Sequence, residues 1–203
     1  LNLGSSLYRF GNEDKEVVPL NPSDVKAIID KAPGQLRLHL LLMANCGFTQ
    51  KDVSDLRPEE IDWEEGRIDR RRSKTKKIKT PFVSWKLWDT TLRLLRQFAE
   101  TEGDHALLTE SGQRWLKDEI IGNKRSKYDA IRRLYLNAGL GLTPMKNLRS
   151  TGASMIKHHA GGETSDHWLG HGPKNVSDRS YWSKNQSKLD EVVRWLGDQY
   201  GIE

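Results

Sequence analysis

The sequence has a single cysteine, Cys46, among its 203 residues. One thiol excludes an intramolecular disulfide and is typical of proteins from a reducing compartment such as the cytoplasm. Cys46 lies in the apolar run LLLMANCG, so we interpret it as a buried residue rather than a nucleophile. The sequence also lacks an apolar run near the ~20 residues of a membrane span, and it lacks a secretory signal at its start. These absences predict a cytoplasmic protein with no membrane partner.

Hydrophobic residues make up only 35% of the chain, whereas 30% of the residues are charged. This balance predicts a polar, mostly helical protein, with room for one large domain or a domain plus an arm. The first residue is Leu1 rather than methionine, so we expect a piece of a longer protein whose upstream domain is missing. The formal net charge of +5 favours a polyanionic partner such as nucleic acid.

Apolar residues recur at helical spacing over much of the chain. The predicted helices cover residues 21–32, 35–46, 49–56, 85–102, 127–138, 143–160, 165–171, 175–182 and 189–200. The second of these is apolar nearly all round and should be a buried core helix, with His39 as a core residue rather than a ligand. Residues 104–125 are interpreted as loop and weak helix. The last helix either closes the core of its own chain or docks on a neighbour, and both alternatives stay open.

An alternating stretch, IDWEEGRIDRRRSKTKKIKTPFVS, interrupts the helices and contains a Glu-Gly turn. It predicts a small antiparallel sheet with strands around Ile61 and Trp63, at residues 67–71 and at residues 78–83. The segment RRRSKTKK between the second and third strands is either a solvated basic turn or a surface for nucleic acid. The sequence therefore predicts a mainly α fold with a small antiparallel β-sheet, of the α+β class.

Chemistry-bearing residues gather between Thr143 and Trp182. Lys146 and Arg149 share one face of a predicted helix, His171 follows in a Leu-Gly-His motif, and Tyr181 comes ten residues later. A tyrosine is a weak nucleophile at neutral pH, and fixed donors must stabilise the charge that develops on a phosphate under attack. An arginine, a histidine and a tyrosine brought together by the fold are the groups that attack on a phosphodiester needs.

Four motifs occur in order along the chain: LLLMANCGFTQKDVSDLRPEEIDW, RSKTKK, KNLR at Lys146–Arg149, and LGHGPKNVSDRSYW. On these motifs, residues 19–200 resemble the catalytic domain of tyrosine recombinases, the phage-integrase type. The resemblance implies the tyrosine recombinase catalytic-domain fold over residues 19–203. Residues 1–18 would then form an arm or interdomain linker, and the missing upstream part would hold a core-binding domain.

The resemblance also implies a role for each matching residue. Tyr181 matches the nucleophile that forms a 3′-phosphotyrosine link to DNA, and Lys74 matches the general acid that protonates the leaving oxygen. Arg149 matches an arginine that grips the scissile phosphate, and His171 matches a residue that hydrogen-bonds a phosphate oxygen. The family uses neither a metal nor another cofactor, so none is expected here.

Two positions depart from the family pattern. Lys146 stands where the family usually has a histidine, a replacement that keeps a hydrogen-bond donor. Thr49 stands at the position of the family's first catalytic arginine, two residues after Gly47. A threonine hydroxyl carries no charge, and loss of one preorganised donor costs on the order of a hundredfold in rate. Lys51, one helical turn on from Gly47, is the alternative cation for this position.

The expected partner is double-stranded DNA, contacted mostly through its phosphates. The expected DNA-binding residues are Arg70, Arg71, Arg72, Lys76, Lys77 and Lys79. The resemblance implies a homotetramer on DNA for the full-length protein, whereas the fragment alone should be a monomer.

Three functions compete. The first is a site-specific DNA recombinase or integrase, and the second is an integrase-like DNA-binding protein whose catalysis is impaired by Thr49. The third is a metal hydrolase built on His167 and His171, but no glutamate lies between these histidines, as such a site would need. The sequence favours the first function.

Overall fold

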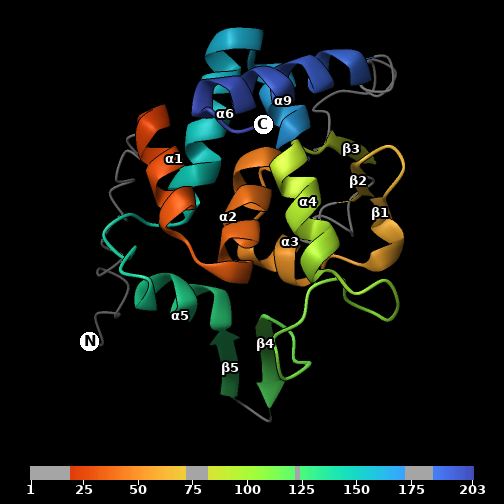
Figure 1. Ribbon diagram of the computed structural model, residues 1–203, viewed down its shortest axis with the longest axis vertical. Helices are drawn as coiled ribbons and strands as arrows, with labels where there is room; N and C mark the ends of the chain where they lie inside the picture. Colours follow the sequence, from red (N-terminus) through yellow and green to blue (C-terminus); the bar gives the residue numbers. More distant parts are fainter. Residues whose placement is uncertain (1–18, 72–81, 122–123, 172–184) are drawn as a thin grey trace, which may run out of the picture.

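The computed structural model describes residues 19–71, 82–121, 124–171 and 185–203, with the backbone alone for residues 118–121 and 124–126. The predicted class is confirmed, because helices dominate and a small antiparallel sheet lies at one side (Figure 1). The helices are α1 (Pro22–Lys31), α2 (Gly34–Cys46), α3 (Gln50–Ser54), the 3-10 helix η1 (Pro58–Glu60), α4 (Asp89–Phe98), α5 (Ala130–Asn137), α6 (Lys146–Ala160), α7 (Gly162–Trp168) and α9 (Gln186–Tyr200). Among the described residues, no helix is long and apolar enough to cross a membrane.

Helix α2 is the centre of the core, as its nearly continuous apolar sequence predicts. Its buried residues are Leu36 and the whole run from Leu38 to Cys46. Helices α1, α4, α6 and α9 surround it (Figure 1). His39 is fully buried, and burial lowers its pKa to about 3 because a charged imidazole would lose its hydration there. Both predictions for this helix, a core histidine and a buried Cys46, are confirmed.

The three-stranded antiparallel sheet has the order β1 (Ile61–Asp62), β2 (Arg67–Arg70), β3 (Val83–Lys86). Ile68 lies opposite both Ile61 and Trp85, and all three side chains are buried. The turn between β1 and β2 is fixed by Asp62, whose carboxylate accepts hydrogen bonds from the next backbone amides. The predicted helix 85–102 was wrong at its start, because Val83–Lys86 pairs with β2 and the helix begins at Asp89. Apolar residues in this stretch fit both strand and helix periods.

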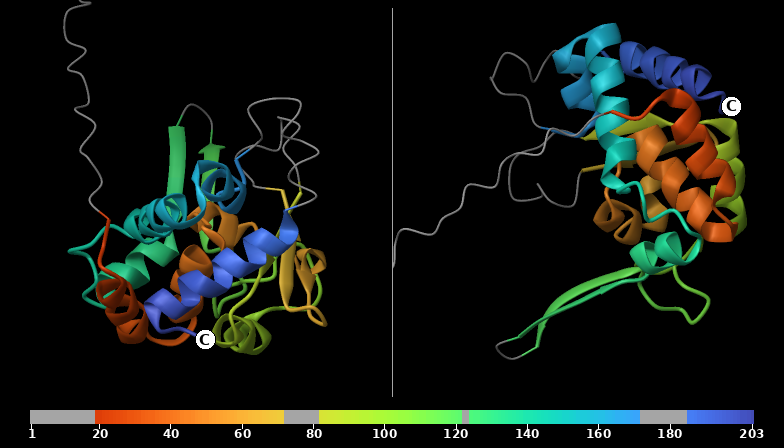
Figure 2. Two further views of the ribbon diagram at one scale, coloured as in Figure 1. Left: turned by 90° about the horizontal axis from the view of Figure 1, so that it is seen from above. Right: turned by 90° about the vertical axis from the view of Figure 1, so that its left-hand side faces the viewer.

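A second hairpin consists of β4 (Leu116–Ile121) and β5 (Lys124–Asp129), and it projects from the body of the molecule (Figure 2). The prediction of loop and weak helix for residues 104–125 was wrong here, and helix α5 starts at Ala130, later than predicted. Mixed charges along both strands hide the apolar alternation that marks most strands. The hairpin is anchored at its base, where the Leu116 amide donates to the Ser54 hydroxyl at 2.9 Å.

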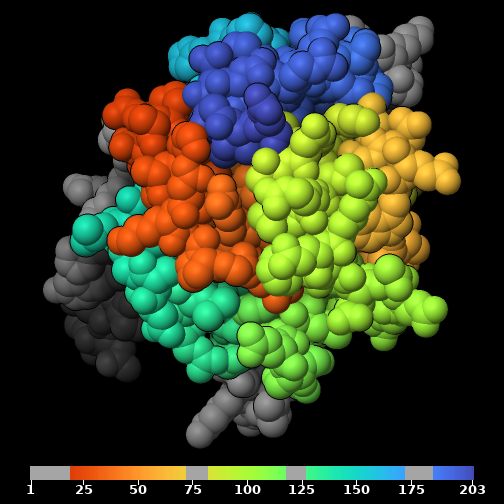
Figure 3. Space-filling model, viewed as in Figure 1, coloured from red at the N-terminus to blue at the C-terminus, as the bar shows by residue number. Residues whose placement is uncertain are grey.

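Helix α9 packs on its own chain, which is the first of the two alternatives left open for it. Its buried residues are Leu189, Val192, Val193, Leu196, Gly197 and Tyr200. The indole of Trp88 donates to the Val193 carbonyl at 2.8 Å, and the Glu203 carbonyl accepts from the Thr90 amide at 2.7 Å. The outer surfaces of α1, α4 and α9 therefore meet on one face of the molecule (Figure 3).

Candidate functional site

The packing of α6 against α7 brings Arg149 to the backbone of the segment that ends at His171. The Arg149 guanidinium donates from Nη2 to the Leu169 carbonyl at 3.2 Å, two residues before His171. His171 is held by the last turn of α7, where its backbone amide donates to the Asp166 carbonyl at 2.9 Å. Its ring Nδ1 lies 3.4 Å from an Asp166 carboxylate oxygen, and 43% of the side chain is exposed. The Arg149 guanidinium thus contacts the backbone of the segment that ends at His171, whose imidazole is partly exposed.

Lys146 is the first residue of α6 and is exposed, one turn before the half-buried Arg149. Residues three apart on a helix lie on neighbouring parts of one face. The expected shared face for Lys146 and Arg149 is therefore present. Both can donate hydrogen bonds to an anion.

The side chain of Trp168 fixes the position of the segment that ends at His171 relative to the end of α2. Its side chain is fully buried, and its Nε1 donates to the Asn45 carbonyl at 2.8 Å. Its own carbonyl accepts from the Trp85 indole at 2.9 Å. A Cβ on Gly47 or on Gly152 would come within 2.9 or 2.7 Å of the Trp168 ring, so both positions require glycine. The ring therefore links α2, β3 and α6 to the segment that ends at His171.

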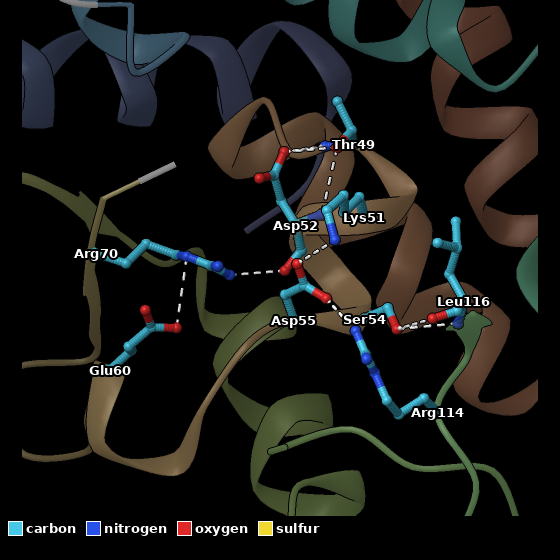
Figure 4. A network of polar contacts seen from close by, with 9 residues as sticks. All are labelled: Thr49, Lys51, Asp52, Ser54, Asp55, Glu60, Arg70, Arg114 and Leu116. Carbon is cyan, nitrogen blue, oxygen red and sulfur yellow. Dashed lines mark hydrogen bonds and ion pairs between the residues drawn. The ribbon is translucent and has the colours of Figure 1, made fainter. Parts of the chain in front are cut away.

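Thr49 lies two residues beyond Gly47 and caps α3 rather than pointing a donor into solvent (Figure 4). Its hydroxyl and its backbone amide both donate to the Asp52 carboxylate, at 2.6 and 2.9 Å. The Asp52 amide donates back to the Thr49 hydroxyl at 3.3 Å, which completes a capping box. The Thr49 hydroxyl is thus engaged in the cap of α3.

The Lys51 amine is paired with Asp55 and not with the Thr49–Asp52 capping box. Its amine forms an ion pair with Asp55 at 2.8 Å, one turn further along α3. Asp55 also pairs with Arg114 at 2.6 Å. Lys51 is thus committed to the side of α3 that faces the base of the β4–β5 hairpin (Figure 4).

Arg70 corrects one of the expected DNA contacts. Its side chain is only 1% exposed, so it cannot contact a DNA phosphate in this structure. Strand β2 alternates, and Arg70 shares the buried face with Ile68. Its neighbour Arg71 is exposed, with its guanidinium 5.8 Å from the centre of the Phe82 ring, and remains available to DNA.

Several predicted site residues lie outside the described residues. They are Tyr181, Lys74, Arg72, Lys76, Lys77 and Lys79. Their predicted roles therefore stay predictions. The ends of the described chain at Arg71 and His171 fix where the segments that carry them begin.

The metal-hydrolase alternative gains no support from the histidines. His167 is buried, and burial lowers its pKa to about 4, although Asp190 acts in the opposite direction. His171, by contrast, is partly exposed and lies beside Asp166. Within the described part of the chain, no group of three or more histidine, cysteine or carboxylate residues is placed to hold a metal ion.

Sequence reasoning missed Asp52 and Trp168, and it assigned the wrong environment to Arg70. Asp52 is 2% exposed and holds Thr49, a pairing that the Thr-x-x-Asp spacing of a capping box could have indicated. The burial of Arg70 could have been found from its register with Ile68. Trp168 gave no such signal, because its partner Asn45 is 123 residues away.

The comparison with solved structures finds the same arrangement of elements. A XerA recombinase aligns with a TM-score of 0.55 at 18% identity, over 90% of this chain and 63% of that chain. The integrase of mycobacterium phage Brujita aligns with a TM-score of 0.60 at 14% identity, over 88% and 58%. The Tn1549 transposon integrase in complex with circular intermediate DNA aligns with a TM-score of 0.55 at 11% identity, over 84% and 63%.

The chain thus spans about three-fifths of the length of these structures. No protein-family model matches the sequence, and no curated protein matches it. The likeness therefore lies in the fold, in which a helical core carries a small antiparallel sheet and ends in a packed helix. The chain has the fold of the catalytic domain of tyrosine recombinases.

Proposed function

We propose that this chain is the catalytic domain of a site-specific DNA recombinase or integrase that cuts and rejoins DNA through Tyr181. The observation that supports the proposal is the hydrogen bond from Arg149 to the Leu169 carbonyl, two residues before His171, in a recombinase fold. An arginine fork and an imidazole are matched to the non-bridging oxygens of a phosphodiester.

The proposed reaction starts with attack of the Tyr181 hydroxyl oxygen on the scissile phosphorus. The new bond is a 3′-phosphotyrosine ester, and the bond that breaks joins phosphorus to the 5′ oxygen. Lys74 gives the leaving oxygen its proton, while Arg149 and His171 stabilise the charge on the phosphate. The ester keeps the energy of the broken bond, so a 5′-hydroxyl can reverse the reaction and rejoin the strand.

The proposed partner is double-stranded DNA. The net charge of +5 favours it, and solved relatives of the same fold include the Tn1549 integrase in complex with DNA. Residues 19–203 would supply the catalytic domain and residues 1–18 an arm that leads to a core-binding domain. We propose that the full-length protein assembles as a homotetramer on DNA and that this fragment alone is a monomer.

A second candidate function is DNA binding with impaired cleavage. The observation that favours it is the capping box at Thr49. In this box the hydroxyl and the amide of Thr49 donate hydrogen bonds to Asp52 and not to a phosphate. One preorganised donor is worth on the order of a hundredfold in rate. A site that lacks this one donor and is otherwise complete would therefore cleave DNA slowly.

The test uses the full-length protein and a DNA site selected from random duplexes by binding. A nick placed just beyond the scissile phosphate lets a short strand diffuse away, which traps the covalent intermediate. We expect a protein–DNA adduct that resists denaturant with the wild type and none with Tyr181→Phe. A protein that selects a site but gives no adduct has the second function, and one that selects no site has neither.

A further inference from the structure

Arg70 is a cation buried in the interior of the protein, where it contacts a backbone carbonyl, a carboxylate and an aromatic ring. The side chain is 1% exposed, and arginine is rarely buried unless it is paired. Its Nη1 donates to the Asp52 carbonyl at 2.6 Å, and its Nε lies 3.5 Å from a carboxylate oxygen of Glu60. The guanidinium carbon lies 5.4 Å from the centre of the Phe48 ring.

These partners bracket Thr49. Phe48 is the residue immediately before it, and Asp52 is the residue whose carboxylate holds its hydroxyl and amide. Figure 4 shows the Arg70 guanidinium reaching across from β2 to the backbone of α3, below the capping box. The fold therefore places an arginine next to the Thr49 turn, but from another strand and from the inside.

The charges near this turn explain why a cation matters there. Asp52 is 2% exposed, and the Glu60 side chain is 14% exposed, so water screens neither carboxylate well. In the described part of the chain, Arg70 places a positive charge against Glu60 and against the Asp52 backbone, next to the neutral Thr49. The Lys51 amine forms an ion pair with Asp55.

We infer that Arg70 is a positioning residue for phosphodiester cleavage: it offsets the Asp52 and Glu60 carboxylates and so makes the Thr49 turn electrostatically acceptable to the scissile phosphate. It acts through α3 and its carboxylates, without touching DNA. The inference rests on the proposed function. Arg70, a buried residue of β2, would thus supply part of the positive charge that an arginine at position 49 would carry.

The test compares two substrates with the full-length protein, one with an ordinary scissile phosphodiester and one with an uncharged methylphosphonate at the same place. Arg70→Met removes the charge and keeps the length of the side chain, whereas Arg70→Lys keeps the charge. We expect Arg70→Met to slow adduct formation on the phosphodiester on the order of tenfold or more and Arg70→Lys to slow it far less. On the methylphosphonate, Arg70→Met and wild type should agree within about twofold, because no phosphate charge remains to be repelled.

A purely structural role would slow both substrates equally, and that result would overturn the inference while leaving the proposed function intact. Failure of the wild type to form an adduct with the phosphodiester would overturn both. If Arg70→Met does not fold, Glu60→Gln decides the matter, since it removes one carboxylate and leaves Arg70 in place. It should raise the rate on the phosphodiester relative to the methylphosphonate, and an unchanged or lower ratio contradicts the inference.

Discussion

The indole Nε1 of Trp168 donates a hydrogen bond to the main-chain oxygen of Asn45 at 2.8 Å, across 123 residues of sequence. Asn45 is itself fully buried, and its side chain accepts from the Trp88 amide and donates to the Lys86 carbonyl. One ring thereby ties the turn before Thr49 to the segment that carries His171. The relative placement of these two parts of the candidate site rests on this contact.

Gly152→Ala should therefore disturb the site by displacing the Trp168 ring. The new Cβ would lie 2.7 Å from the Trp168 ring, which fully buried neighbours prevent from moving. We expect a loss of about 1–3 kcal/mol in the free energy of unfolding, measured with urea. Gly162→Ala is the matched control, because nothing lies within 4 Å of its Cβ, and it should be neutral or slightly stabilising. Equal stability of the two variants would contradict the account of Trp168.

Asp190→Asn should loosen α9. Arg67 of β2 donates to both Asp190 carboxylate oxygens, at 2.9 and 2.5 Å. Burial acts to raise the pKa of Asp190, but hydrogen bonds from Arg67 and Gln186 outweigh it and hold the pKa below its usual range. We expect Asp190→Asn to lower the free energy of unfolding by about 1–2 kcal/mol at pH 7.

This difference has a defined pH dependence. A carboxyl with a lowered pKa stabilises the fold above its unfolded pKa of about 4 and loses that contribution as pH falls towards the folded value. The difference in the free energy of unfolding between Asp190→Asn and wild type should therefore become smaller below pH 4. Asp30→Asn, whose ion pairs are exposed, is the control and should cost less than about 1 kcal/mol. A gap that stays constant from pH 7 to pH 3 would rule out the ion pair as its cause.

His39→Leu should make stability less sensitive to acid. Burial lowers the His39 pKa to about 3, while the unfolded chain has its histidine near 6.5. The neutral ring thus contributes fully above pH 6.5, and that contribution is lost progressively as pH falls towards 3. When the pH is lowered from 7 to 5, the free energy of unfolding of the variant should rise by about 2 kcal/mol relative to that of wild type, as measured by urea unfolding. Parallel stability curves for the two proteins would refute the lowered pKa.

The fold was largely predictable because its main signals are local. Helix α2 is apolar on all sides and hence central. The β4–β5 hairpin escaped prediction because Lys117 and its charged neighbours mask any alternation in that stretch. The site was less predictable, since the contact of Trp168 with Asn45 depends on tertiary packing and leaves no periodic trace.

The basic segment RRRSKTKK supplies a prediction about DNA affinity. Each phosphate contact that a lysine makes contributes about 0.9 to the slope of log K against log salt concentration. The double variant Lys76→Ala/Lys77→Ala should therefore flatten that slope by about 2. A matched double variant on α1, Lys26→Ala/Lys31→Ala, should leave it unchanged. If both pairs behave alike, the assignment of Lys76 and Lys77 to phosphates is wrong.

The most direct test of the account is the identity of the residue that becomes linked to DNA. The adduct from the nicked substrate is digested with protease and nuclease, and the modified peptide is sequenced by mass spectrometry. The account predicts a nucleotide bound through its 3′ phosphate to Tyr181. A nucleotide on any other residue, or an adduct that still forms in Tyr181→Phe, would contradict it.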